Sequence, residues 1–193
     1  MRNETTPDLI TEPIKELCES IVNNEPPIFI DVDVKDYSIE NECFMNVETT
    51  ILKFGGKQVN GWAIWQWANI LIEAEAHSVW LSPDGRMLDI TPHNYSEKRI
   101  LFLPDSQLIY NNNCIPSVRR SLTNSILVQE LIELNNEKDR LLCESSEDTY
   151  QLPKELIMKI FQITSVINKK VKHYELCPCR SGLKYKHCCG KFD

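Results

Sequence analysis

The chain has 193 residues, of which 42% are hydrophobic and 25% charged, a composition typical of one ordinary globular core with a small additional module. No stretch approaches the roughly 18 consecutive apolar residues of a membrane-spanning helix, so no membrane span is predicted. The net charge of −7 is unevenly distributed, because residues 153–193 hold nine Lys/Arg against three Asp/Glu and the rest is strongly acidic. An acidic body argues against nucleic-acid binding by that part, whereas the basic tail could contact RNA, anionic lipid or an acidic protein surface.

The first residues, MRNETTPDLI, are polar and acidic, which is not the pattern of a secretory signal peptide. We therefore expect a cytoplasmic protein. In that reducing compartment the eight cysteines are expected to be thiols or metal ligands rather than a disulfide framework.

Hydrophobic periodicity predicts an α+β chain with a small antiparallel sheet packed against helices. In chain order we expect a helix at 8–23, a strand at 28–34, a helix at 42–54, a strand-rich region at 58–103, and helices at about 121–143 and 153–173. This order divides the chain into an α+β body over 1–145, a helical connector over 146–173 and a terminal module over 174–193.

The terminal module contains four cysteines in the stretch CPCRSGLKYKHCCG, namely Cys177, Cys179, Cys188 and Cys189. Four converging thiolates suit a tetrahedral zinc ion, and four protein ligands close its coordination shell. We therefore expect one structural Zn²⁺ per chain, without which so short a segment would not fold. Gly182 allows the chain to double back between the two cysteine pairs.

This stretch closely resembles the SEC-C motif, the zinc-binding tail of the SecA preprotein translocase ATPase, which recurs at the ends of many bacterial proteins. The resemblance implies the same four cysteine ligands, with His187 as the rival to Cys189 for the fourth place. Arg180 stands where the motif usually has glycine. In SecA this tail contacts a chaperone and the ribosome, so the resemblance implies a protein partner for the tail.

Candidate catalytic residues lie in the body, at Cys43, His77 and Asp89. Cys43 falls in the first turn of the predicted helix at 42–54, after Asn41 as a plausible cap, and helix N-termini favour a thiolate. His77 lies on a predicted strand at 69–81. Alternation places Glu73, Glu75, His77 and Val79 on one face of that strand.

The turn SPDG at 82–85 decides whether Asp89 joins His77. If Gly85 forms a bulge, Ser82 faces Arg86, and Asp89 then lies on the face of the sheet that carries His77. A plain two-residue loop would shift the register by one residue and send Asp89 to the opposite face.

The order of these residues and the phrase AHSVWLSPDGRMLDITP resemble the papain-like and transglutaminase-like thiol enzymes. By that resemblance Cys43 would attack an acyl carbon, His77 would take its proton and Asp89 would orient the imidazole. Papain-like enzymes carry a glutamine about six residues before the cysteine, and this chain has Tyr37 there.

Two functions follow from these observations. The first is a thiol hydrolase or acyltransferase acting on an amide or thioester, with the zinc tail as its docking module. The second is a non-catalytic binding or adaptor protein that uses the tail. Simpler interpretations stand beside the first: Cys43 as an inert buried thiol, Asp89 as a turn residue, or a second metal site at Glu73, Glu75 and His77.

Other conspicuous side chains are assigned no chemistry. Trp62, Trp65 and Trp67 are expected to be core and edge packing rather than the lining of a ligand groove. His93 is expected to be a surface loop residue. Cys18, Cys114 and Cys143 stand alone in the sequence.

Overall fold

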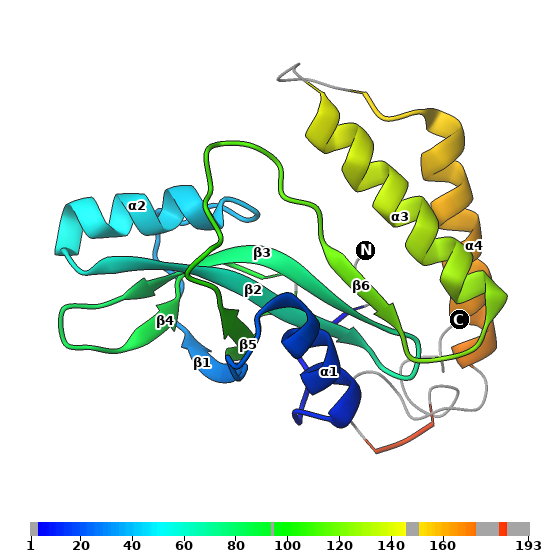
Figure 1. The fold of residues 1–193 in the computed structure, drawn as a ribbon, viewed down its shortest axis with the longest axis horizontal. Helices are drawn as coiled ribbons and strands as arrows, with labels where there is room; N and C mark the ends of the chain where they lie inside the picture. Colours follow the sequence, from blue (N-terminus) through cyan, green and yellow to red (C-terminus); the bar gives the residue numbers. More distant parts are fainter. Residues whose placement is uncertain (1–3, 94, 146–150, 173–181, 185–193) are drawn as a thin grey trace. The chain divides into compact units, whose positions relative to one another are not determined.

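The structure is a computed structural model that describes residues 4–93, 95–145, 151–172 and 182–184. It separates into two compact units, Met1–Leu122 and Thr123–Asp193 (Figure 1). The boundary after Leu122 places the helix predicted at 121–143 with the second unit. The three-part division made from the sequence stays a prediction, because most of its terminal module lies outside the described residues.

The first unit is built on a closed barrel. Its strands are β1 (Ile28–Val32), β2 (Lys57–Trp67), β3 (Leu71–Leu81), β4 (Met87–Asp89) and β5 (Arg99–Pro104). They follow the order β2-β5-β1-β4-β3, and a long antiparallel pairing of β2 with β3 closes the ring. The α+β prediction is therefore confirmed, although the expected antiparallel sheet is a barrel with one parallel pair, β1 with β4.

A sixth strand, β6 (Val118–Ser121), was not predicted and pairs with the outer part of β3. Its four residues are only half-buried, and two of them are arginines, so it carries no hydrophobic alternation. The strand is held by its pairing with β3, by the packing of Val118 against the core, and by a largely buried ion pair between Arg119 and Glu73 at 2.7 Å. Strand pairing up to Ser121 also explains why the following helix begins later than expected.

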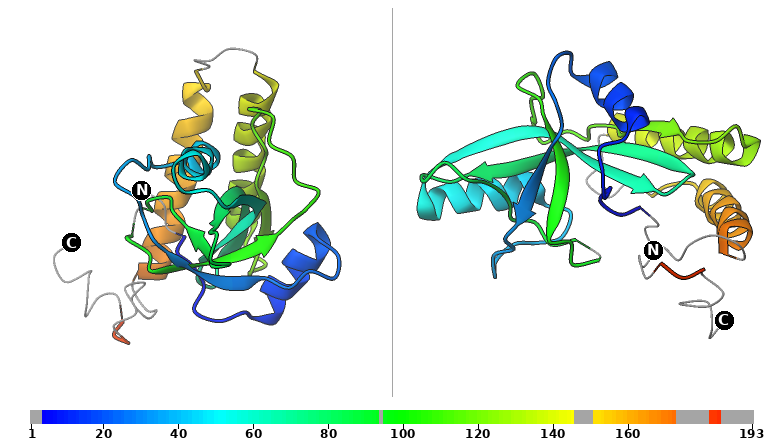
Figure 2. Two further views of the ribbon diagram at one scale, coloured as in Figure 1. Left: turned by 90° about the vertical axis from the view of Figure 1, so that its left-hand side faces the viewer. Right: turned by 90° about the horizontal axis from the view of Figure 1, so that it is seen from below.

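Alternation along the strands sends one set of side chains into the barrel and the other set outward. The interior is filled by apolar side chains from all five strands: Ile30, Ala63, Trp65, Val79, Met87, Ile100 and Phe102. The outer surface is covered on opposite sides by helix α1 (Glu12–Ile21) and helix α2 (Cys43–Phe54), as Figure 2 shows. Both helices were predicted close to these bounds.

The polar face of β3 points into the barrel. Val79 belongs to the interior cluster, so His77, Glu75 and Glu73 lie on the interior side of the strand. Trp65 Nε1 donates to Glu75 at 2.9 Å. His77 is buried and both glutamates are half-buried, so the polar side of this strand lines the barrel interior.

The turn between β3 and β4 has the bulged register. Gly85 adopts φ = 86°, and Ser82 N–H donates to the Arg86 carbonyl at 2.9 Å. Leu81 then pairs with Met87, which brings Asp89 to the interior side that carries His77. This outcome confirms the register predicted for a bulge at Gly85.

The second unit contains helix α3 (Ile126–Glu144) and helix α4 (Lys154–Lys172), which run side by side in Figure 1. An ion pair between Lys159 and Glu130 at 2.9 Å joins them. Among the described residues, none of the helices is both long enough and apolar enough to cross a membrane.

The tryptophans of β2 are buried, and the cysteines outside the tail differ in oxidation state. Trp62, Trp65 and Trp67 are all buried, as core packing requires, but Trp65 also lines the small cavity beside Cys43. Cys18 and Cys43 are free thiols, whereas Cys114 and Cys143 are disulfide-bonded. The expectation of thiols therefore holds for two of these four cysteines.

Candidate thiol site

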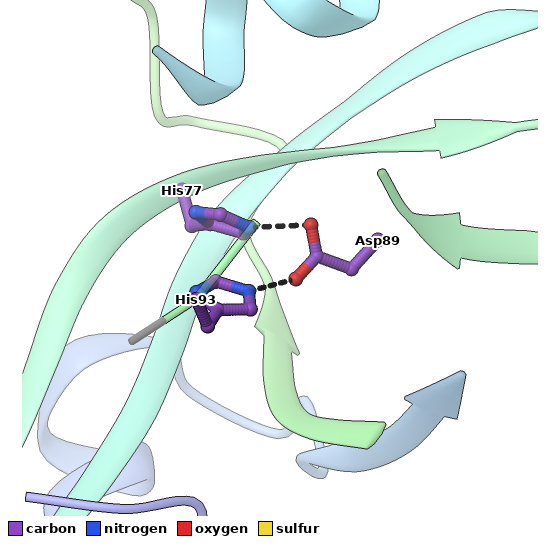
Figure 3. A group of neighbouring side chains, drawn as sticks. All are labelled: His77, Asp89 and His93. Atoms are coloured by element: carbon purple, nitrogen blue, oxygen red, sulfur yellow. Dashed lines mark hydrogen bonds and ion pairs between the residues drawn. The ribbon is translucent and has the colours of Figure 1, made fainter. Parts of the chain in front are cut away.

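The structure brings Cys43, His77 and Asp89 together from three different elements. Cys43 is the first residue of α2, His77 lies near the middle of β3, and Asp89 ends β4. His77 Nε2 lies 3.1 Å from Asp89 Oδ1 (Figure 3). Their side chains are 6% and 0% exposed, so this pair is shielded from solvent.

Cys43 occupies the start of its helix without a side-chain cap. The residue before it, Glu42, is the N-cap and makes no capping hydrogen bond with its side chain. Asn41 was expected to cap this helix, and that expectation is wrong, since it lies one residue further out with φ = 66°. Asparagine tolerates this left-handed conformation better than most residues, which suits it to the turn that leads into α2.

A buried amide ties the Cys43 segment to the Asp89 segment. The Asn46 side chain accepts a hydrogen bond from Ile39 N–H at 2.9 Å and donates to the Ile39 carbonyl at 2.8 Å. It also donates to Thr91 Oγ1 at 3.2 Å, and Thr91 N–H in turn donates to Asp89 Oδ1 at 3.0 Å. One side chain therefore fixes the loop before the cysteine relative to the loop after the aspartate.

Replacing Asn46 with alanine should lower the free energy of unfolding by about 2–3 kcal/mol, because a buried amide loses three hydrogen bonds, one of them to the buried Thr91. Urea denaturation followed by far-ultraviolet circular dichroism, which reports on both units, measures the change. Asn135→Ala on α3 is the matched control, since its amide donates to the Leu131 carbonyl of its own helix and its loss should cost under about 1 kcal/mol. Equal losses in the two variants would contradict the role given to Asn46.

His93 is part of this site, so the expectation of a surface loop residue is wrong. Its Nε2 lies 2.5 Å from Asp89 Oδ2, its side chain is 12% exposed, and its ring meets Trp65 edge-on. Figure 3 shows both imidazoles turning one nitrogen toward Asp89 and the other nitrogen away from it. The sequence contained one usable signal, a second histidine four residues after the aspartate in DITPH.

The protonation states follow from the buried carboxylate. Burial raises the pKa of Asp89, but His77 and His93 outweigh that effect and hold it below its ordinary value. Burial also lowers the pKa of His77, whereas Asp89 and Cys43 raise it, and the net result lies well above the ordinary value. An ionised Asp89 only accepts hydrogen bonds, so both imidazoles donate to it through Nε2.

The Nε2 contact of His77 leaves Nδ1 as the nitrogen for Cys43, whose side chain contributes a hydrogen bond to the histidine. A protonated histidine beside a thiol is the arrangement by which thiol enzymes activate their cysteine. The three side chains thus have the chemical complement of an activated cysteine.

A small cavity of about 90 Å³ opens onto the thiol. Besides Cys43, it is lined by side chains from β2, β3 and the segment after β4, among them Trp65, Glu75, His77, His93 and Tyr95. Cys43 therefore borders this cavity although the residue is only 7% exposed.

The same side chains also have the composition of a metal site, since ligand atoms of His77, Asp89 and His93 lie within 4.8 Å of one another. Each imidazole Nε2, however, is directed at its own oxygen of Asp89. Hydrogen-bonded pairs of this kind place protons, not lone pairs, between the groups. Glu73 and Glu75 do not converge with His77 on a metal either, because they bond to Arg119 and Trp65.

The four predicted zinc ligands of the tail, Cys177, Cys179, Cys188 and Cys189, lie outside the described residues, as does His187. Four thiolates are nevertheless a donor set that fits zinc. Gly182 is described and adopts φ = 73°, a left-handed conformation that glycine allows without strain.

Comparison with known proteins identifies a motif in the tail and a partial match to one much longer relative. Residues 175–191 match the SEC-C motif. A protein translocase subunit SecA from a Nitratiruptor species is 37% identical over 83 residues, which cover 38% of this chain and 10% of that protein. The chain thus matches about a tenth of the length of this relative. No solved structure matches, so the papain-like resemblance of the body has no support from a solved relative.

Proposed function

We propose that the body is a cysteine hydrolase or acyltransferase acting on an amide or thioester, with Cys43 as nucleophile, His77 as its base and Asp89 as the residue that orients the base. One observation carries this proposal: a buried imidazole stands between a thiol at a helix N-terminus and a buried carboxylate, beside an open cavity. The chain order and the bulged turn agree with a papain-like or transglutaminase-like arrangement.

In this mechanism the Cys43 thiolate attacks the acyl carbon and forms a tetrahedral intermediate. His77, protonated at Nδ1, then gives that proton to the leaving amine or thiolate as the carbon–leaving-group bond breaks. Water, or an amine in an acyl transfer, attacks the resulting thioester while His77 accepts its proton. The carbon–sulfur bond then breaks, which releases the acid or amide product and restores the Cys43 thiolate beside the protonated His77. Asp89 keeps the Nε2 proton of His77 in place and balances the charge of the imidazolium.

The uncapped start of α2 supplies part of an oxyanion hole. Because no side chain caps this end, the N–H groups of its first turn are available to a developing negative charge next to Cys43. Tyr37, which stands where papain-like enzymes have glutamine, bonds instead to Thr50 Oγ1 at 3.0 Å. The oxyanion hole we propose therefore rests on backbone groups.

An activated ester tests the nucleophile directly. With p-nitrophenyl acetate, the full chain should release a burst of nitrophenol and carry an acetyl group on Cys43 that is then lost to water. Mass spectrometry of the Cys43 peptide measures this acylation, and Cys43→Ser should abolish it. Acetylation no greater at Cys43 than at the buried Cys18 would rule out the enzyme.

For the tail we propose a zinc-folded docking module that binds a protein partner, in keeping with the SEC-C match and the basic charge of residues 153–193. A chaperone or the ribosome would suit by resemblance to SecA. If Cys43 proves inert while the tail still binds zinc, the adaptor function is the better one. For both candidate functions we propose a cytoplasmic location in a bacterium.

A further inference from the structure

The carboxylate of Asp89 serves two imidazoles, although a Cys-His-Asp site requires only one. Oδ1 accepts from His77 and from the Thr91 N–H, and Oδ2 accepts from His93. With three donors around a side chain that is 0% exposed, the negative charge of Asp89 is divided among all of them.

This division matters for the proton on His77. A buried carboxylate whose charge is not shared raises the pKa of the imidazole beside it, which makes the imidazolium a weaker acid toward a leaving group. Acid–base catalysis is most efficient when the pKa of the group lies near the working pH. The surroundings of His77 raise its pKa well above the ordinary value. A second donor to Asp89 lowers that pKa toward the working pH, which is the direction that catalysis requires.

We propose that His93 is a positioning residue that acts through Asp89: its Nε2–H occupies Oδ2, fixes the carboxylate plane toward His77, and withdraws charge so that His77 can release its proton. Its catalytic meaning rests on the function proposed above. The contact itself, and its effect on His77, do not.

The groups that face His77 come from every element around it. Cys43 approaches from α2, Asp89 from β4, and His93 from the following segment with its ring centroid 5.8 Å away. Glu75 shares the interior side of β3, and Phe102 contributes an uncharged ring edge from β5. Of these side chains, His93 bonds to Asp89 and can be substituted while Cys43 and His77 stay unchanged.

The test follows the imidazole carbon-bound protons of His77 by NMR as a function of pH, in the full chain and in the variants His93→Leu and His93→Gln. A raised pKa means that His77 stays protonated until the pH exceeds it. In His93→Leu the titration midpoint of His77 should rise by about half a pH unit or more, because the negative charge of Asp89 is no longer shared with His93. In His93→Gln, which keeps an N–H donor near the same place, it should stay within about 0.2 units of the wild type.

An unchanged or lower midpoint in His93→Leu would overturn the proposal, as would equal shifts in the two variants. A purely structural role would lower the melting temperature without moving the His77 midpoint upward. If His93→Leu does not fold, His93→Asn replaces it, because the shorter amide does not reach Oδ2. The readout needs no reactive cysteine, so its failure and a failure of the acylation experiment are distinguishable.

Discussion

Replacing His77 with alanine should slow the alkylation of Cys43 by iodoacetamide at pH 7 by about thirtyfold. An isolated thiol with an ordinary pKa of about 8.5 is only about three per cent ionised at that pH, and the proposed mechanism requires His77 to hold Cys43 as the reactive thiolate. The rate is measured at the Cys43 peptide by mass spectrometry, over a range of pH from about 5 to 10.

The molecule provides an internal control for this experiment. Burial raises the pKa of Cys18 to about 11, so its alkylation should be slow at pH 7 in both proteins and unaffected by the change at His77. His77→Gln guards against misfolding, since its amide keeps a hydrogen-bonding group in the barrel but takes no proton. If Cys43 titrates as an ordinary thiol in the wild type as well, the thiol enzyme is excluded.

Replacing both Cys188 and Cys189 with serine should reduce bound zinc from about one ion per chain to none, because two of four thiolate ligands are lost. Structural zinc in small modules contributes about 10–16 kcal/mol of apparent binding free energy, so the segment should unfold with the loss of the metal. Elemental analysis of the full chain measures the stoichiometry.

Cys43→Ser is the control, and it should keep the full zinc content. The single variant Cys189→Ser tests whether His187 is the fourth ligand. If this variant keeps its zinc, and a further His187→Ala change removes the zinc, the fourth ligand is His187. Zinc retained in the Cys188→Ser, Cys189→Ser double variant would refute the tail site. A second ion lost on changing His93 would instead favour a metal at His77, Asp89 and His93.

The parts of this fold that could be predicted are those that local chemistry determines. The helix at 43–54 has a strong apolar periodicity, and the SPDG turn carries a glycine at the position of positive φ, so both the helix and the register of Asp89 followed from short stretches. The proximity of His77 and Asp89 depended on that register alone.

What could not be predicted depends on long-range pairing. Closure of the barrel requires β2 to pair with both β3 and β5, and no local pattern signals a ring. Without the ring, the polar side of β3 resembles a solvated face, although it lines the interior. His93 was missed for the same reason, because a histidine after proline resembles a surface loop until Trp65 and Asp89 are placed around it.

The bulged turn at Gly85 has a consequence for how this site tolerates sequence change. Substitutions at Asp84 or Arg86 leave the length of the turn intact, whereas deletion of a single residue would exchange the two sides of β4. Leu88 would then enter the barrel and Asp89 would leave it, with every residue of the site still present in the chain. The site is thus far more sensitive to the spacing of these residues than to their neighbours' identities.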